Sequence, residues 1–293
     1  MAPVLFLYIM QAAIESLHMK LTCHKLEYQY FPDQKSSTCQ YGRLALQPKP
    51  KTTKGNAFQI NNLLYVDDGT FLFSTLTEMK DATQTIHDHF ARFGLQMHIG
   101  SEKAKSKTEA MFFPSSLIQA ESQKTLPKNF DLNNGANHVQ FTDKFKYLGS
   151  MITPCLTENA EIDARIRKAK SQMGILRHFF NCKDIELRVK YWVYVAGPLN
   201  VLLWGSESWN LSDQNRIKLR AFHHSAIHRI LGIWMDEVIE CRIMNEQVRL
   251  WFGNIPPIDE FITRRTWRYI RKVFRAKEEM LPKKMLGAWI PAS

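Results

Sequence analysis

The sequence has few of the features that mark secreted, membrane-spanning or zinc-binding proteins. Its five cysteines are widely spaced, none forms a C-x-x-C pair, and no histidine lies at zinc-ligand spacing from a cysteine pair. The apolar run at residues 1–10 is too short to span a bilayer and has no basic residues before it. No internal repeat or low-complexity segment is visible. We therefore expect an intracellular protein, in the nucleus or the cytoplasm, with reduced thiols and no contact with a membrane.

Acidic residues are the minority among the charged side chains, and the basic excess is uneven. The 293-residue chain carries a net charge of +11. Residues 1–155 hold 16 Lys and Arg against 13 Asp and Glu (+3), whereas residues 156–293 hold 23 against 15 (+8). Such an excess favours a polyanionic partner, nucleic acid first and an acidic membrane surface second. Charge that serves only solubility explains the composition equally well.

Two adjacent carboxylates stand inside an otherwise apolar segment, residues 61–74. The segment contains Tyr65-Val66-Asp67-Asp68, with apolar residues on both flanks. Neighbouring side chains on a strand point to opposite faces, so packing alone does not explain both charges. If they are buried, they repel each other and lose hydration unless a cation pairs with them. The alternative is a polar hairpin turn, because Asp-Gly is a common turn signal.

The first half of the chain has the pattern of an α+β fold. Residues 4–17 predict a buried helix, and the 61–74 segment predicts a hairpin. Helical spacing predicts a second helix at 77–93, capped by Thr77 and ended by Gly94. Further expectations are a loop at 48–51, a strand pair from 95–99 and 110–113 around a basic stretch, and a hairpin formed by 139–141 with 145–152.

The second half predicts helices. An apolar stripe begins at Ile162 and continues to Phe180 at helical spacing. Residues 185–204 are apolar enough to be buried, and Ser212 and Gly232 fit the two ends of another helix. A last helix is expected at 258–275. Four arginines fall on one narrow stripe of that helix, either to bind a phosphate backbone or to form a solvated face: Arg264, Arg268, Arg271 and Arg275.

Several segments resemble one protein family in the same order along the chain. Tyr65-Val66-Asp67-Asp68 resembles the Y-x-D-D motif of reverse transcriptases. Residues 93–97 followed by 105–111 resemble their next palm motif, and residues 145–150 (Phe-Lys-Tyr-Leu-Gly-Ser) resemble their primer-grip hairpin. The segments 203–209, 222–224 and 229–232 resemble the C-terminal part of LINE-type (non-LTR) retrotransposon polymerases. The likeness covers nearly the whole chain.

The resemblance implies which catalytic groups the chain holds. Asp67 would bridge two Mg²⁺ ions in a complete site, and Asp68 would support it, during nucleotidyl transfer. Lys107, or else Lys103 or Lys105, would protonate or screen the pyrophosphate. An exposed loop lysine is the alternative interpretation of each.

The resemblance also implies missing parts. Family members carry an earlier palm strand with a metal-binding Asp, and a Gln-Gly-Asp segment just before a helix whose start residues 1–6 resemble. Asp131 and Asp143 are expected in loops and do not replace that strand. We therefore expect the fingers and the first half of the palm to be missing, and the chain to be inactive by itself.

The same resemblance predicts where nucleic acid binds. Tyr147, Leu148 and Gly149 would position the primer end, although they could equally form only a tight turn. The helix from about Glu161 would lie along the duplex as a thumb, with Arg165 and Lys168 near phosphates and a strongly salt-dependent affinity. Trp204 and Trp209 are expected in the core or in an interface, rather than as platforms on which bases stack.

These expectations combine into one hypothesis. Residues 1–155 would be part of a reverse transcriptase palm, and residues 156–293 a helical thumb with an extension. The function would be that of a fragment of an RNA-directed DNA polymerase, with an RNA template, a DNA primer and dNTP as partners. One alternative is a non-catalytic nucleic-acid-binding remnant. Another is an untranslated or misfolded product, because the helix at 4–17 and the sheet edge beside Asp67 would expose apolar area.

Overall fold

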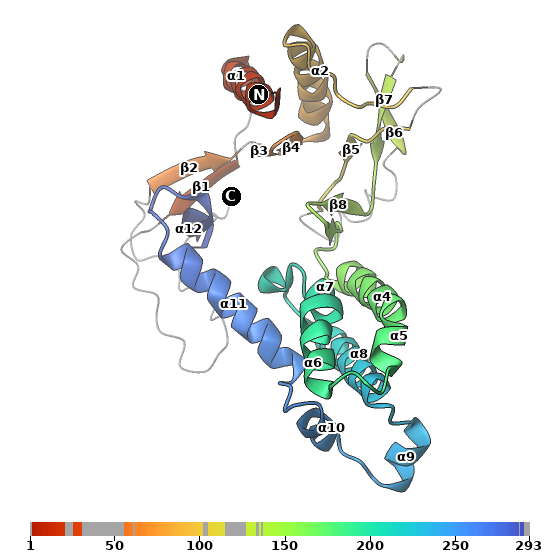
Figure 1. Ribbon diagram of the computed structural model, residues 1–293. Helices are drawn as coiled ribbons and strands as arrows, with labels where there is room; N and C mark the ends of the chain where they lie inside the picture. Colours follow the sequence, from red (N-terminus) through yellow and green to blue (C-terminus); the bar gives the residue numbers. More distant parts are fainter. Residues whose placement is uncertain are drawn as a thin grey trace. The chain divides into compact units, whose positions relative to one another are not determined.

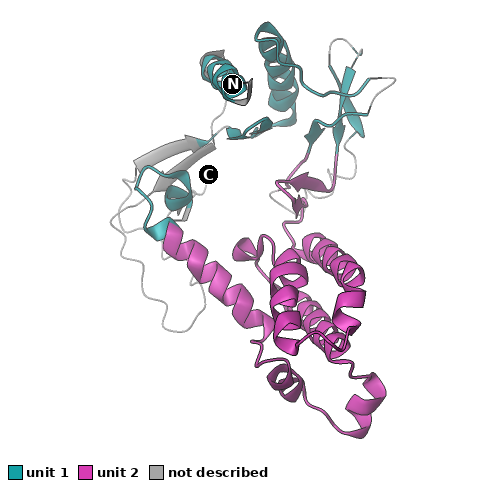
Figure 2. Cartoon of the chain, in the orientation of Figure 1, with its two compact units in different colours: residues 1–110, 126–141, 273–293 teal, residues 111–125, 142–272 magenta. Residues whose placement is uncertain are grey.

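The computed structural model describes residues 2–20, 26–30, 56–60, 62–101, 105–114, 127–132, 135, 137–286 and 288–289. The chain divides into two compact units, coloured teal and magenta in Figure 2. Unit 1 comprises residues 1–110, 126–141 and 273–293, and unit 2 comprises residues 111–125 and 142–272. The expected loop at 48–51 and Lys103 lie outside the described residues.

Helices α1 (Ala2–Lys20) and α2 (Leu76–Arg92) form the helical core of unit 1 (Figure 1). Ala13, Ile14 and Leu17 of α1 pack with Ile86 and Phe90 of α2. A buried histidine joins the two helices, because the His89 ring lies 3.0 Å from the carbonyl oxygen of Ala13 and 2.9 Å from the hydroxyl of Ser16. The predicted helix at 4–17 is thus confirmed.

The burial predicted for the first turns of α1 is wrong. Val4 and Leu7 are 58% and 46% exposed, and Ala12 is exposed as well. Only the following turns meet α2, so the apolar residues near the start of α1 remain on the surface. Burial by a neighbouring element cannot be inferred from hydrophobic spacing alone.

Helix α2 begins and ends with specific caps. The Thr75 hydroxyl accepts a hydrogen bond from the Glu78 amide at 3.2 Å, so Thr75 and not Thr77 is the N-cap. At the other end, Gly94 has a φ of +71°, and the Leu95 amide donates to the Phe90 carbonyl at 3.0 Å. Together with the bond from the Gly94 amide to the Ala91 carbonyl, this is a Schellman motif. The predicted stop at Gly94 is confirmed.

Strands β3 (Asn62–Tyr65) and β4 (Asp68–Phe71) form the expected antiparallel hairpin. Its register pairs Tyr65 with Asp68 and leaves Val66 and Asp67 as a two-residue turn. Phe71 contacts the core of α1 and α2. A separate antiparallel sheet in the same unit contains β1 (Leu26–Tyr30), β2 (Asn56–Ile60) and β10 (Ala288–Trp289), in the order β10-β1-β2.

A third sheet of unit 1 has the order β5-β7-β6, formed by β5 (Glu109–Ala110), β7 (Asn137–Phe141) and β6 (Asn129–Leu132). Two predicted pairings are therefore wrong. β5 pairs in parallel with β7 and not with residues 95–99, and β7 pairs with β6 and not with 145–152. The segment 95–99 instead reaches β7 through Gly100, whose amide donates to the His138 carbonyl at 2.9 Å.

Unit 2 has one core of helices. Helix α4 (Asn159–Ile175) carries the predicted apolar stripe, and Ile162, Ala169 and Met173 of it are buried. The stripe continues on a separate short helix, α5 (Arg177–Asn181), through Phe180. Helix α8 (Asp213–Leu231) has Ser212 as its N-cap and Gly232, with a φ of +73°, at its end, as predicted.

The apolar segment at 185–204 is helical but not uniform. Helix α6 (Leu187–Tyr194) continues as a π-helical stretch at Val195–Leu199 and returns to α-helix in α7 (Asn200–Leu202). Pro198 lies within the π-helical stretch, where the wider turn accommodates a residue that lacks an N–H group. Leu199, Leu202 and Leu203 are buried in the core of the unit. A 3₁₀ turn follows at Ser206–Ser208.

The remaining helices are α9 (Met235–Glu240), α10 (Asn245–Trp251), α11 (Ile258–Phe274) and α12 (Leu281–Leu286). The predicted last helix is confirmed as α11, of which Ile258 and Ile262 join the core of unit 2. The α+β fold class is confirmed. The boundary at residue 155 stays a prediction, while by compactness the hairpin at 145–152 groups with the helices.

No helix within the described part of the chain is both long enough and apolar enough to cross a membrane.

Candidate polymerase and nucleic-acid interface

Asp67 and Asp68 lie at the tip of the β3–β4 hairpin, and both are exposed. Tyr65 and Val66 beside them are 57% and 49% exposed. The desolvation expected for the two carboxylates is therefore wrong, because the apolar flanks of the hairpin do not cover them. A polar turn is enough to explain their stability. Their exposure leaves both carboxylates accessible to a cation from solution.

The backbone of this turn is strained. Val66 has a φ of +56°, in the left-handed region that a β-branched residue rarely adopts. Two-residue hairpin turns require a positive φ at the first central position, where glycine is usual. A non-glycine residue held there costs of order 1–3 kcal/mol, and such strain clusters at functional sites. The pairing of Tyr65 with Asp68 closes this turn and places Asp67 directly before Asp68.

The two residues predicted to bind metal, Asp67 and Asp68, stand next to each other at the hairpin tip. Among the described residues, no three His, Cys, Asp or Glu side chains lie close enough together to hold a metal ion. Asp131 lies on strand β6 and not in a loop, so that expectation is wrong, but it does not complete such a group. Oxygen ligands of this type suit Mg²⁺, which usually keeps several waters and binds one or two carboxylates plus substrate phosphates.

Lys107, the predicted pyrophosphate contact, is exposed in the segment that precedes β5. Its amide donates to the His98 carbonyl at 3.1 Å, which fixes the backbone and leaves the side chain at the surface. Lys105 is exposed as well. The structure thus does not separate the two described candidates.

In unit 2, strands β8 (Phe145–Tyr147) and β9 (Ser150–Ile152) form the hairpin that resembles a primer grip. Tyr147 pairs with Ser150, and both turn residues have positive φ values, +47° at Leu148 and +89° at Gly149. This is the signature of a type I′ turn. The tight turn is confirmed, and the role of these residues at a primer end stays a prediction; Leu148 is 43% exposed.

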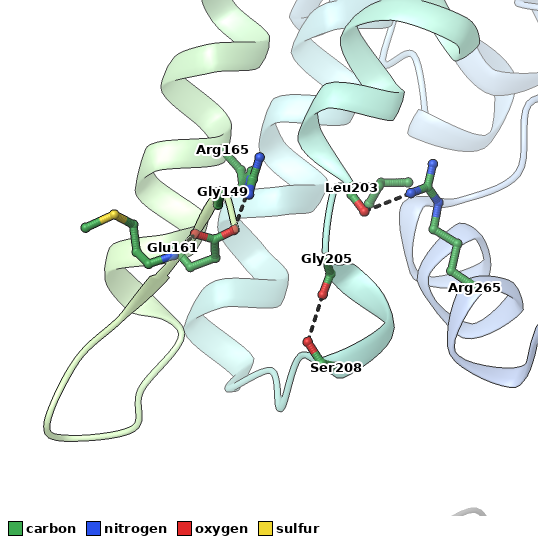
Figure 3. A network of polar contacts seen from close by, with 8 residues as sticks. Gly149, Glu161, Arg165, Leu203, Gly205, Ser208 and Arg265 are labelled. Atoms are coloured by element: carbon green, nitrogen blue, oxygen red, sulfur yellow. Dashed lines mark hydrogen bonds and ion pairs between the residues drawn. The ribbon is translucent and has the colours of Figure 1, made fainter. Parts of the chain in front are cut away.

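A buried ion pair on α4 holds this hairpin (Figure 3). The Arg165 guanidinium donates to the Glu161 carboxylate at 2.6 Å and to the Gly149 carbonyl at 2.6 Å. The other Glu161 oxygen accepts from the Met151 amide at 2.7 Å. The hairpin turn and its returning strand are thereby fixed to the first turns of α4. Arg165, predicted as a phosphate contact, is only 4% exposed and is used inside the protein.

Lys168 stands one turn beyond Arg165 on α4 and is exposed. Burial lowers the pKa of Lys168, and the nearby Arg165 and Lys146 charges lower it further, while Glu161 opposes them. Like charges therefore gather on this face of the hairpin and α4. Such a cluster attracts an anion.

The predicted arginines on α11 and just after it are all exposed. Arg264 is paired with Glu260, one turn earlier on the same helix, so the stripe is not wholly without acidic neighbours. Arg268 and Arg271 extend the stripe in unit 2, with Trp267 beside it at 55% exposure. Ile262 and Val273 of the same helix are buried, whereas Tyr269 is 44% exposed.

Sequence comparison adds one observation to this geometry. The chain is similar to a transposon-derived protein. That uncharacterized protein, from Caenorhabditis elegans, is 22% identical over 224 residues, which cover 76% of this chain and 75% of the relative. No family model matches the sequence, and no solved structure matches the chain.

Sequence reasoning missed two contributors to the hairpin environment. Glu161 forms the buried pair with Arg165, and the i, i+4 spacing of opposite charges was the available signal. Trp204 was expected in the core or an interface; at 56% exposure beside the hairpin turn it is not in the core, and an interface stays a prediction. Trp209 does pack against the core, as expected.

Proposed function

We propose that this chain is the palm and thumb part of a retrotransposon RNA-directed DNA polymerase, which binds an RNA template with a DNA primer. Asp67 and Asp68 would contribute to its Mg²⁺ site, and the basic surface of unit 2 would contact the duplex backbone. The observation that supports this proposal most directly is the Asp67-Asp68 pair at the strained tip of a two-residue hairpin turn. Similarity to a transposon-derived protein supports the same origin.

The hairpin geometry is suited to metal-dependent phosphoryl transfer. Its carboxylates are exposed and adjacent, so a hydrated Mg²⁺ ion that carries a nucleotide phosphate can reach them. In two-metal catalysis one ion activates the attacking oxygen and the other stabilises the leaving oxygen. This proposal assigns to Asp67 and Asp68 the binding of metal at those positions.

Paramagnetic broadening by Mn²⁺, used in place of Mg²⁺, tests the metal site. In NMR spectra of the full chain we expect Mn²⁺ to broaden the Gly69 and Thr70 amides first, and Asp67→Asn with Asp68→Asn to abolish this. Asp131→Asn is the matched control, because Asp131 is also exposed but lies on β6 and not on the β3–β4 hairpin. Equal broadening in the double variant would refute the metal assignment.

Fluorescence anisotropy with an RNA–DNA primer–template tests the nucleic-acid assignment. The logarithm of affinity should fall linearly with the logarithm of salt concentration, by about 0.9 per phosphate contact. The double variant Arg268→Gln/Arg271→Gln should reduce that slope by about 2. Arg229→Gln, at an exposed position of α8, should leave it unchanged. Absence of binding at low salt would overturn the proposed function.

A second candidate function is nucleic-acid binding without catalysis. The exposed arginines of α11 and the lysines beside the β8–β9 hairpin favour it independently of the carboxylates. Because the chain is expected to be inactive by itself, metal binding at the hairpin decides between the two. Mn²⁺ broadening that is lost in Asp67→Asn with Asp68→Asn supports the polymerase part, whereas primer–template binding with no such broadening supports the second function.

A further inference from the structure

The loop at Trp204 and Gly205 touches the tip of the β8–β9 hairpin. A Cβ atom added to Gly149 would lie 3.5 Å from the indole nitrogen of Trp204, and one added to Gly205 would lie 3.1 Å from the Ser150 hydroxyl. Both glycines have positive φ values, +89° and +78°. The two turns therefore pack closely against each other, and both belong to unit 2.

Trp204 is exposed although the residues around it are buried. The residue is 56% exposed, whereas Leu202, Leu203 and Ser206 are at 0%. Arg265 fixes the backbone before the tryptophan by donating to the Leu203 carbonyl at 2.9 Å (Figure 3). A large aromatic ring is thus held on a rigid frame with much of its surface available to a partner.

Two lysines on this hairpin and on α4 are exposed and close enough to interact, and the carboxylate near them is already engaged. Lys146 on β8 and Lys168 on α4 are exposed. Glu161 is taken up by Arg165 and by the Met151 amide, so it does not neutralise the lysines fully. The hairpin that meets the indole at Gly149 carries the exposed Lys146 and Leu148, and Lys168 lies near Lys146. Together these residues combine positive charge with a stacking surface. Single-stranded nucleic acid and strand ends are bound by this combination.

We propose that Trp204, together with Leu148, is a stacking platform for the terminal base of a bound nucleic-acid strand, and that Lys146 and Lys168 contact its phosphates. This inference rests on the proposed nucleic-acid function and adds to it a specific ligand group, the unpaired or frayed base at a strand end. Arg165 and Glu161 are positioning residues, which hold the hairpin turn against α4 so that Gly149 meets the indole.

The test separates stacking from phosphate contact by salt dependence. Base stacking neutralises no phosphate, so Trp204→Ala should weaken primer–template binding by about tenfold without changing the salt slope. Trp204→Phe should retain most of the affinity. Lys168→Gln and Lys146→Gln should each lower the slope by about 1. Trp192→Ala is the matched control, because Trp192 is 60% exposed on α6.

A modified strand end makes the test specific. An abasic primer terminus should weaken binding to the wild-type chain by the same factor as Trp204→Ala, and should cost the Trp204→Ala variant nothing further. Thermal melting confirms that each variant is folded. Equal losses in Trp204→Ala and Trp192→Ala, or an abasic effect that persists in Trp204→Ala, overturn the inference. If the wild-type chain binds no primer–template at all, the proposed function itself fails.

Discussion

Arg165 and Glu161 form an ion pair of 2.6 Å in which both side chains are nearly inaccessible, at 5% and 2% exposure. The pair uses its remaining hydrogen-bonding groups on the β8–β9 hairpin, at the Gly149 carbonyl and the Met151 amide. Its chief effect is therefore geometric, because it fixes a turn to a helix. A buried pair that is fully hydrogen-bonded costs much more to break than it contributes net.

Arg165→Met should destabilise unit 2 by about 3–5 kcal/mol, since it leaves the Glu161 carboxylate buried without its counter-charge. Adding Glu161→Gln should restore part of the loss. Arg167→Met, at an exposed position two residues along α4, should change the stability by about 0.5 kcal/mol or less. Urea unfolding measures all three, and similar losses at 165 and 167 would contradict the role of the pair.

Acid should destabilise unit 2 through His223. The ring is fully buried, where its Nε2 lies 3.2 Å from the Pro256 carbonyl and its Nδ1 lies 2.8 Å from the Tyr194 hydroxyl. A carbonyl only accepts, so Nε2 carries the proton and Nδ1 accepts from Tyr194. Burial, followed by the His224 charge, lowers the pKa of His223 from 6.5 to about 4.

Between those two pKa values the unfolded chain binds a proton that the folded chain does not. The free energy of unfolding should therefore fall as the pH drops from about 6.5 to about 4, by roughly 3 kcal/mol, and the His223 contribution should be constant below that range. Urea unfolding across this pH range measures it. His223→Gln should flatten the dependence, whereas His178→Gln, at an exposed site, should not.

Two glycines of unit 2 should respond to alanine with opposite signs. Gly232 has a φ of +73° and open space where a methyl group would be added, so Gly232→Ala should cost about 1–2 kcal/mol from backbone strain alone. Gly174 lies within α4, without a positive φ and with equally open space. Gly174→Ala should therefore stabilise the unit by about 0.5–1 kcal/mol. Urea midpoints report both, and a common sign would be inconsistent with these backbone conformations.

The N-cap of α2 provides a further test in unit 1. Thr75→Ala removes the acceptor of the Glu78 amide and should cost about 1 kcal/mol. Thr77→Ala lies inside the first turn of the helix, where alanine is favourable, and should be neutral or slightly stabilising. Hydrogen exchange of the first-turn amides distinguishes the two threonines. Greater loss of protection in Thr77→Ala would show that the cap is assigned to the wrong residue.

Features set by nearby residues could be predicted from the sequence. Helix α8 begins after Ser212 and ends at Gly232 because a hydroxyl cap and a left-handed glycine act within one turn. The Asp67 hairpin likewise follows from apolar runs on both sides of a short polar segment. Helical periodicity also identified the buried stripe from Ile162 to Phe180.

Pairing and burial depend on distant parts of the chain, and there the predictions were less successful. β5 is two residues long and finds its partner in β7 across an intervening segment, which local propensity does not reveal. The sequence alone predicts that Arg165 is exposed on its helix. In the structure the hairpin packs over it, and Arg165 donates to the Gly149 carbonyl. Trp204 has a core-like composition around it, yet the turn at Gly205 directs its ring to the surface.

The π-helical stretch at Val195–Leu199 determines the direction in which the side chains after it point, relative to those of α6. One additional residue in a helix rotates all later side chains by about 100° relative to the preceding face. Pro198 stabilises that extra residue against removal, since an ordinary α-helical turn would bring its ring against a carbonyl. Deleting one residue there would consequently turn Trp204 away from Gly149 while leaving every residue of the hairpin unchanged.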